Sequence, residues 1–202
     1  MTRTEGASPS DNELAIHRLI NRWIVYRDSG DWERLRAIWH EDGTMTAGWR
    51  KGSADDFIAA SKAGWDGKLK VMHELGAVEV EVVGNRAVSQ NKMAIWVRAD
   101  LDGVLCDAMC MARHLDRWEK RGALWGLLAR ETIYDRDRLD AVIPGEVPQL
   151  DFSLLNSYGE GYRHMAYMFI KLGHEISTDF PALKTPQGDA LVSAWRAWLR
   201  QS

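Results

Sequence analysis

Hydrophobic residues near the start of the chain recur at intervals of three and four, which is the period of an α-helix. The positions that follow this spacing are Ile16, Leu19, Ile20, Trp23 and Ile24. Ser10 and Glu13 have the spacing of a capping box, which marks the beginning of a helix. Gly30 interrupts the pattern, so the first helix is expected to end there. The nine residues before this helix are small and polar and predict a disordered lead-in.

Two more short helices are expected before the pattern changes. Asp31 is a suitable N-cap for a second helix, whose apolar positions are Trp32, Leu35, Ile38 and Trp39. Ser53 is a suitable N-cap for a third helix, expected from Ala54 to about Trp65. Between these helices, residues 44–49 are a candidate strand.

From Lys70 onward the period changes to two, which is typical of β-strands. Val78, Val80 and Val82 alternate with two glutamates. Longer strands are then expected over residues 87–99, 105–118 and 123–134, separated by turns at Asp102-Gly103 and Arg121-Gly122. On the first of these, Met93, Ile95 and Val97 are expected to share one face. Three helices followed by a strongly bent antiparallel sheet predict an α+β fold, a cone-shaped barrel whose concave face lines a pocket.

The C-terminal third has helical patterns again. Residues 135–149 are charged and then contain proline, which predicts a linker that leaves the sheet into solvent. Helices are expected over Gly161–Leu172 and Asp189–Leu199. A segment of this size is too short to be stable alone. We therefore expect a main domain over residues 10–140 and a helical extension over residues 141–202 that packs on this domain or on a neighbouring subunit.

Composition narrows the possible partners. The net charge of −3 gives no reason to expect nucleic acid or an anionic membrane as partner. No stretch is apolar enough for a membrane span, and the N-terminus lacks the apolar core of a signal peptide. The expectation is a soluble, cytoplasmic protein. Ten Trp residues among 202 fit either a packed core or a cavity for an aromatic ligand.

Several common kinds of site are absent from the sequence. Cys106 and Cys110 would be about 13 Å apart on one strand, too far for a disulfide, so both are expected to be reduced. His40, His164 and His174 lack metal-ligand spacing, and no metal site is expected. The chain has no glycine-rich phosphate loop, no G-x-S-x-G and no H-E-x-x-H.

Asp28 and His73 are the strongest candidates for acid–base chemistry. In the predicted cone, the end of the first helix and the beginning of the sheet face each other across the opening. A histidine can act as a base at neutral pH, and an adjacent carboxylate holds its tautomer and stabilises the imidazolium. Each residue alone has a structural alternative: Asp28 as a solvated carboxylate at a helix end, and His73 as a core histidine in the loop that enters the sheet.

Arg130 is a third candidate, because an arginine in an apolar strand needs a partner or a substrate anion. An ion pair with Glu131 or another carboxylate is the alternative. Tyr26, Asn91, His114 and Trp49 are candidate substrate-binding residues. Whether the strand residues among them face the cavity depends on a register that one residue would invert.

Three segments resemble the SnoaL-like branch of the nuclear transport factor 2 superfamily. Residues 26–35 resemble the junction of the first two helices in the scytalone dehydratases. The segment Met72-His73-Glu74 resembles the catalytic-histidine segment of these enzymes and of the hexachlorocyclohexane dehydrochlorinases. Residues 118–130 are similar to a final hairpin that carries an active-site arginine. The resemblance covers about residues 10–140.

The resemblance implies a cone-shaped barrel that works without a cofactor, as a homo-oligomer, with a trimer favoured over a dimer. It assigns the catalytic Asp–His dyad to Asp28 and His73, with Arg130 as third member. The sequence departs from the family in two places. The position of the first active-site tyrosine holds Arg27, next to Tyr26, and a second catalytic histidine has no clear counterpart.

The implied activity is that of a cofactor-independent lyase acting on a hydrophobic, aromatic or polycyclic small molecule. A dehydratase or other β-elimination fits first, and retro-aldol cleavage that releases a small aldehyde needs the same base. Isomerase or cyclase chemistry also fits. The alternatives are a non-catalytic module for ligand binding or assembly and an epoxide hydrolase of the same fold.

Overall fold

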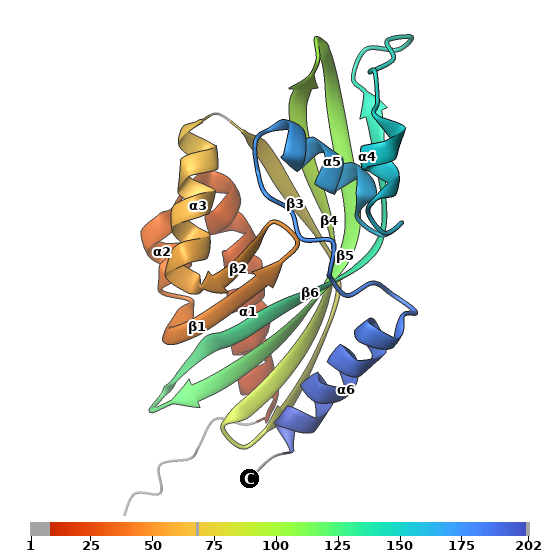
Figure 1. Ribbon diagram of the computed structural model, residues 1–202. Helices are drawn as coiled ribbons and strands as arrows, with labels where there is room; N and C mark the ends of the chain where they lie inside the picture. Colours follow the sequence, from red (N-terminus) through yellow and green to blue (C-terminus); the bar gives the residue numbers. More distant parts are fainter. Residues whose placement is uncertain (1–8, 68, 201–202) are drawn as a thin grey trace, which may run out of the picture.

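One curved sheet with helices on both faces makes up the computed structural model, which describes residues 9–67 and 69–200 (Figure 1). The strands are β1 (Trp39–Ala47), β2 (Arg50–Ser53), β3 (Lys70–Val83), β4 (Arg86–Leu101), β5 (Val104–Arg121) and β6 (Leu124–Ala141). The helices are α1 (Pro9–Ser29), α2 (Trp32–Arg36), α3 (Ala54–Asp66), α4 (Phe152–Asn156), α5 (Arg163–Lys171) and α6 (Pro186–Leu199). The strand order is β2-β1-β6-β5-β4-β3. The predicted α+β fold is confirmed, although the sheet stays open and does not close into a barrel.

The N-terminal helices begin close to where the sequence predicts, and α1 and α3 also end there. Gly30 follows α1 with a φ of +71°, a conformation that L side chains rarely adopt. Asp31 caps α2 by accepting a hydrogen bond from the Arg34 N–H. Ser53 and Asp56 form a capping box at α3. The predicted lead-in lies outside the described residues, except that Pro9 already belongs to α1.

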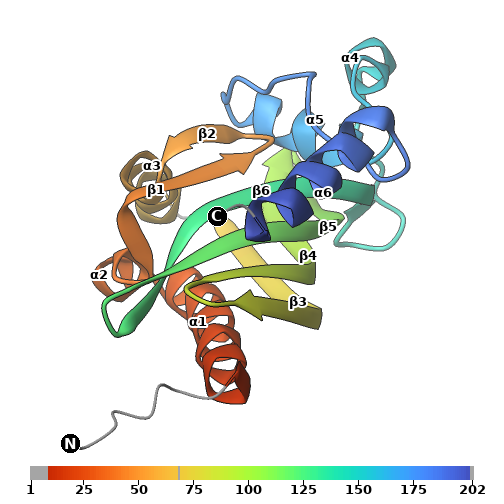
Figure 2. The same cartoon turned by 90° about the horizontal axis from the view of Figure 1, so that it is seen from below.

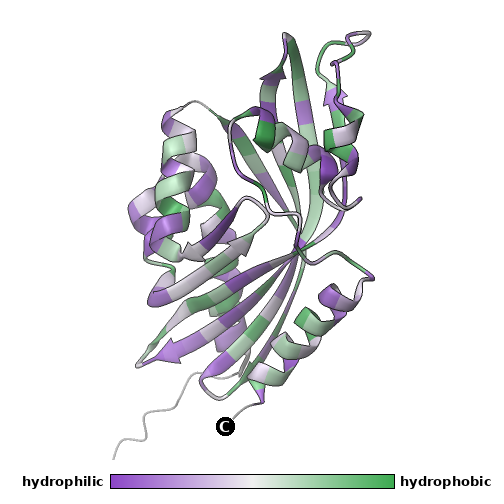
Figure 3. Cartoon of the chain, viewed as in Figure 1, coloured by the Kyte–Doolittle hydropathy of each residue, from purple (hydrophilic) through white to green (hydrophobic). Residues whose placement is uncertain are grey.

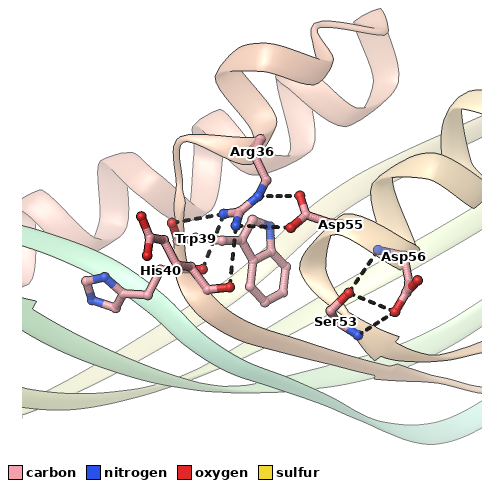
Figure 4. A network of polar contacts seen from close by, with 7 residues as sticks. Arg36, Trp39, His40, Ser53, Asp55 and Asp56 are labelled. Carbon is pink, nitrogen blue, oxygen red and sulfur yellow. Dashed lines mark hydrogen bonds and ion pairs between the residues drawn. The ribbon is translucent and has the colours of Figure 1, made fainter.

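Arg36 ties α2, β1 and α3 together (Figure 4). Its guanidinium donates to the Asp55 carboxylate of α3, with Nε 2.5 Å from Oδ1. The same side chain donates to the backbone carbonyls of Trp39 and His40 at 3.3 and 3.2 Å. These contacts fix α3 over the beginning of β1, and α3 forms one wall of the cavity described below.

Tight hairpin turns join the long strands. Asp102 and Gly103 both have positive φ, 54° and 93°, as expected for a turn with left-handed central residues. Hydrophilic and hydrophobic bands alternate along the strands (Figure 3). Met93 and Val97 are buried on the face that the alternation predicts. The hairpins β3–β4, β4–β5 and β5–β6 are therefore set by local sequence patterns.

Two predicted boundaries are wrong. Trp39 was expected in the second helix, but it opens β1 because it pairs in parallel with Leu127 of β6. Residues 135–141 were expected in a solvated linker, but they continue β6 and pair with β5 from Met111 to Cys106. The side chain of Asp137 in this stretch is fully buried. Neither pairing can be read from local periodicity, because each depends on a distant strand.

The C-terminal extension covers both faces of its own sheet. Met165, Met168 and Phe169 of α5 pack with residues of β4 and β5 on the concave face. Trp195 and Leu199 of α6 pack with Leu115 on the opposite face. Both faces can be covered in this way because neighbouring residues of a strand point to opposite faces of the sheet. Figure 2 shows α1 and α6 on opposite sides of the strands. The extension therefore helps to enclose the concave side and also protects the outer side.

Candidate functional site

A cavity lies on the concave face of the sheet, between α1, α3 and α5. The space within it amounts to about 740 Å³ when the open solvent at its mouth is included. Aromatic side chains make up much of its wall, namely Trp23, Trp49, Phe57, Trp65, Tyr134, Tyr162 and Phe169. A mostly apolar cavity with a few polar groups is the usual form of a small-molecule site.

Asp28 and His73 meet at this cavity. Asp28 Oδ2 accepts a hydrogen bond from the His73 backbone N–H at 2.7 Å, and Oδ1 lies 2.7 Å from His73 Nδ1. His73 is the fourth residue of β3, not part of a loop, and its side chain is 8% exposed. The edge of its ring meets the Trp23 ring, with centroids 5.6 Å apart. The carboxylate therefore holds both the backbone and the ring of His73.

The protonation state of His73 follows from these contacts. An ionised carboxylate only accepts hydrogen bonds, so Nδ1 carries the proton and Nε2 keeps its lone pair. Burial lowers the pKa of His73 below its usual 6.5, while the Asp28 carboxylate acts in the opposite direction. His73 is consequently neutral at neutral pH, with an unprotonated Nε2 on the edge of the ring away from Asp28.

A second buried imidazole lines the same cavity. His114 lies on β5, between Asn91 of β4 and Thr132 of β6. Its ring meets Trp23 edge-on with centroids 5.9 Å apart, and its Nδ1 has no hydrogen-bond partner among the described residues. Burial, and then the charge of Arg130, lowers the pKa of His114 well below 6.5. His114 is therefore a neutral polar group on the cavity wall.

Arg130 is bound to Asp116 instead of Glu131. Arg130 Nε and Nη2 donate to the two Asp116 carboxylate oxygens at 2.7 and 2.8 Å, and both side chains are buried. The guanidinium carbon lies 4.2 Å from the centroid of Trp23. Arg130 is absent from the described residues that form the cavity wall, whereas Trp23, which its guanidinium contacts, is one of them.

Of the remaining residues that were predicted to bind substrate, one lies on the cavity wall and two do not. Trp49 lines the cavity and stacks on Phe169, with centroids 6.0 Å apart. Asn91 lies behind the wall and donates to Asp116 Oδ2 at 2.5 Å. Tyr26 of α1 is partly buried against the neighbouring core, under the guanidinium of Arg34. The structure thus brings His73, His114 and Trp49 to the cavity, with Asp28 directly behind His73.

The cavity also contains polar residues that the sequence analysis did not select. Arg27 of α1 and Ser61 of α3 line it, and so does His174 from the extension. The sequence does contain a signal for Arg27. It lies on the same helical stripe as Ile20 and Trp23, at a position where an apolar residue is expected and a charged one is found. No local signal marks His174, which comes from a loop that tertiary packing brings to the site.

Other candidate chemistry is not gathered here. Among the described residues, no cluster of three or more His, Cys, Asp or Glu side chains could hold a metal ion. Cys106 and Cys110 are buried and free. Asp137 holds the backbone and ring of His164 in the same way that Asp28 holds His73, but His164 is not on the cavity wall. No described helix has the length and apolar character needed to cross a membrane.

Comparison with known proteins agrees with this architecture. An uncharacterized protein of Emericella nidulans is 32% identical over 200 residues, covering 91% of this chain and 84% of that protein. Pea pathogenicity protein 2 of Fusarium vanettenii is 33% identical over 172 residues, covering 83% and 74%. The first of these alignments is long enough to include much of the C-terminal extension.

Solved structures show the same fold at lower identity. Hexachlorocyclohexane dehydrochlorinase (LinA) type 2 superposes with a TM-score of 0.56 at 15% identity, covering 69% of this chain and 95% of that one. A candidate scytalone dehydratase of Novosphingobium aromaticivorans superposes with a TM-score of 0.54 at 17% identity and the same coverage. Residues 9–131 match the SnoaL-like domain. The predicted resemblance to SnoaL-like proteins is therefore confirmed, and the chain belongs to the SnoaL-like domain family.

Proposed function

We propose that the protein is a cofactor-independent lyase that acts on a hydrophobic aromatic molecule, with His73 as general base. The observation that supports this proposal most strongly is the hydrogen bonding of His73. Its Nδ1 is held by Asp28, which leaves Nε2 unprotonated in a residue that lines an aromatic cavity. A base placed in this way accelerates proton abstraction by about 10²- to 10⁴-fold.

The proposed reaction is a β-elimination. His73 Nε2 takes a proton from a carbon of the substrate, and the electrons of that C–H bond form the new double bond as the group on the neighbouring carbon leaves. Asp28 stabilises the imidazolium that forms. In a dehydration, the imidazolium returns its proton to the departing hydroxyl, which leaves as water. The base is then restored, so one histidine serves both half-steps.

Retro-aldol cleavage would use the same group. There His73 takes the proton of a substrate hydroxyl, the neighbouring C–C bond breaks, and an aldehyde leaves. The carbanion that remains takes the proton back from the imidazolium. The dehydrochlorinase and dehydratase names among the structural neighbours favour elimination, which we therefore place first.

Two neighbours are proposed to assist without acting as base. His114 lines the cavity with a neutral imidazole, and a substrate oxygen or nitrogen would give its Nδ1 the partner that it lacks. Arg130, held by Asp116 behind Trp23, is a positioning residue. It fixes the Trp23 ring and adds positive charge that keeps both imidazoles neutral.

A generic elimination probe tests the proposal before any natural substrate is known. 5-Nitrobenzisoxazole loses the proton on carbon to a base while its N–O bond breaks, which gives a coloured cyanonitrophenolate. The wild-type protein is expected to accelerate this reaction by about 10²-fold or more over buffer, and to saturate with substrate. Saturable binding of the probe without acceleration would contradict the proposal and favour a ligand-binding module.

A further inference from the structure

Arg27 is a buried cation on the cavity wall. It lies one helical turn after Trp23 on the inward face of α1, and it is 6% exposed. Arg27 belongs to the last turn of α1, which Gly30 ends, and its side chain lines the cavity. Arginine is almost never fully buried in proteins unless it has a partner.

The structure supplies no such partner. Arg27 Nε is buried without a hydrogen bond, and within residues 9–67 and 69–200 no ion pair involves this side chain. The neighbouring Asp28 directs both carboxylate oxygens to His73. The guanidinium also lies over the Trp32 ring, at 5.7 Å from its centroid. A ring face attracts a cation, but it does not satisfy the N–H donors.

A buried guanidinium without an ion-pair partner is energetically costly. Burial lowers the pKa of Arg27 below its usual value, while the nearby Asp28 charge partly offsets the effect. A buried donor such as Arg27 Nε costs free energy when it is unpaired, and a hydrogen bond to an anionic ligand would offset that cost. The planar fork of a guanidinium matches the two oxygens of a carboxylate.

Ser61 adds a second unpaired group on the same side of the cavity. Its hydroxyl is buried, lines the cavity and lacks a hydrogen-bond partner among the described residues. It lies one turn of α3 before Trp65. The Trp65 ring contacts the Trp32 ring, and the Arg27 guanidinium lies over that same Trp32 ring. The charge of Arg27 also reaches His73, whose pKa it helps to lower. An oxygen bound here would therefore be close to the proposed base.

We propose that Arg27, assisted by Ser61, is the subsite for an anionic oxygen of the substrate, a carboxylate or phenolate carried on an aromatic framework. This inference deepens the proposed function, because it assumes that the cavity is the substrate site. Its test measures binding alone, so the two proposals can fail separately.

The test compares 2-naphthoate with 2-naphthamide, which has nearly the same shape but no charge, by titration calorimetry. The wild-type protein is expected to bind the acid about 10- to 100-fold more tightly than the amide, as a charge-assisted hydrogen bond allows. Arg27→Gln is expected to remove this preference and to leave the affinity for the amide within about threefold, since such a change alters only the charged contact.

The matched control is Arg22→Gln, which removes an exposed arginine from the same helix and is expected to keep the preference. Arg27→Lys is expected to retain part of it, because the charge remains but the fork is lost. Equal binding of acid and amide by the wild type, or binding of neither, would overturn the proposal. So would an equal loss of both ligands in Arg27→Gln, which would indicate a purely structural role. A clear preference for the acid without turnover of the elimination probe would refute the lyase proposal and leave the subsite intact.

Discussion

His73→Ala is expected to lower kcat/KM for 5-nitrobenzisoxazole by about 10²- to 10⁴-fold, to the rate of the buffer alone. The physical reason is that the substitution removes the unprotonated Nε2, and no other described carboxylate or imidazole has the same arrangement on the cavity wall. His114 also lines the cavity, but it has no carboxylate bound to its ring to stabilise an imidazolium. It therefore cannot replace His73 as base.

The same variant must be shown to fold. His73 is paired with Ile95 in the β3–β4 hairpin through its backbone, and alanine keeps that backbone. The circular dichroism spectrum and the affinity for 2-naphthoate are therefore expected to stay close to those of the wild type. His17→Ala, on α1 away from the cavity wall, serves as the activity control. A rate within about threefold of the wild type would contradict the assignment, since it is far smaller than a base contributes.

Asp28→Asn is expected to have the second-largest effect, a fall in kcat/KM of about 10²- to 10⁴-fold with binding largely unchanged. An asparagine can still accept the His73 backbone N–H through its carbonyl oxygen. Its NH₂ group then faces Nδ1 and favours the tautomer with the proton on Nε2, which cannot act as a base. The change also removes the negative charge that raises the pKa of His73. The acid limb of the pH–rate profile is therefore expected to move to lower pH.

The matched control for this change is Asp31→Asn, three residues further along. Asp31 caps α2, and asparagine caps helices about as well as aspartate. Its activity and stability are expected to match the wild type. A full rate in Asp28→Asn, or an acid limb that does not move, would show that the carboxylate only positions the strand.

Local patterns in the sequence specify much of this fold. The sequence correctly predicts the helix caps at Asp31 and Ser53 and the turn at Asp102-Gly103. Each of these features depends only on residues that are close together in the sequence. The length of β6 could not be predicted in this way. Asp137 looks like a solvated charge in the sequence, but its carboxylate accepts from the backbone N–H groups of His164 and Met165 at the beginning of α5.

The candidate site shows the same division. Asp28 and His73 are 45 residues apart, and the family resemblance, more than their local chemistry, brought them together in the prediction. Arg130 was selected because a charge in an apolar strand requires a partner. The partner is Asp116 on the adjacent strand β5, which the sequence could not distinguish from a ligand. Arg27 was the clearer anomaly, because it is a buried charge that forms no ion pair with any residue that the structure describes.

The proposed mechanism requires that His73 is a neutral base whose Nε2 is free to take a proton from a ligand. Nitrogen-15 NMR of the histidine side chains, assigned by comparison with His73→Gln, measures this directly. At neutral pH the His73 ring is expected to be uncharged, with the proton on Nδ1 and none on Nε2, and to become charged only below its usual pKa of about 6.5. An imidazolium at neutral pH, or a proton on Nε2, would contradict the account.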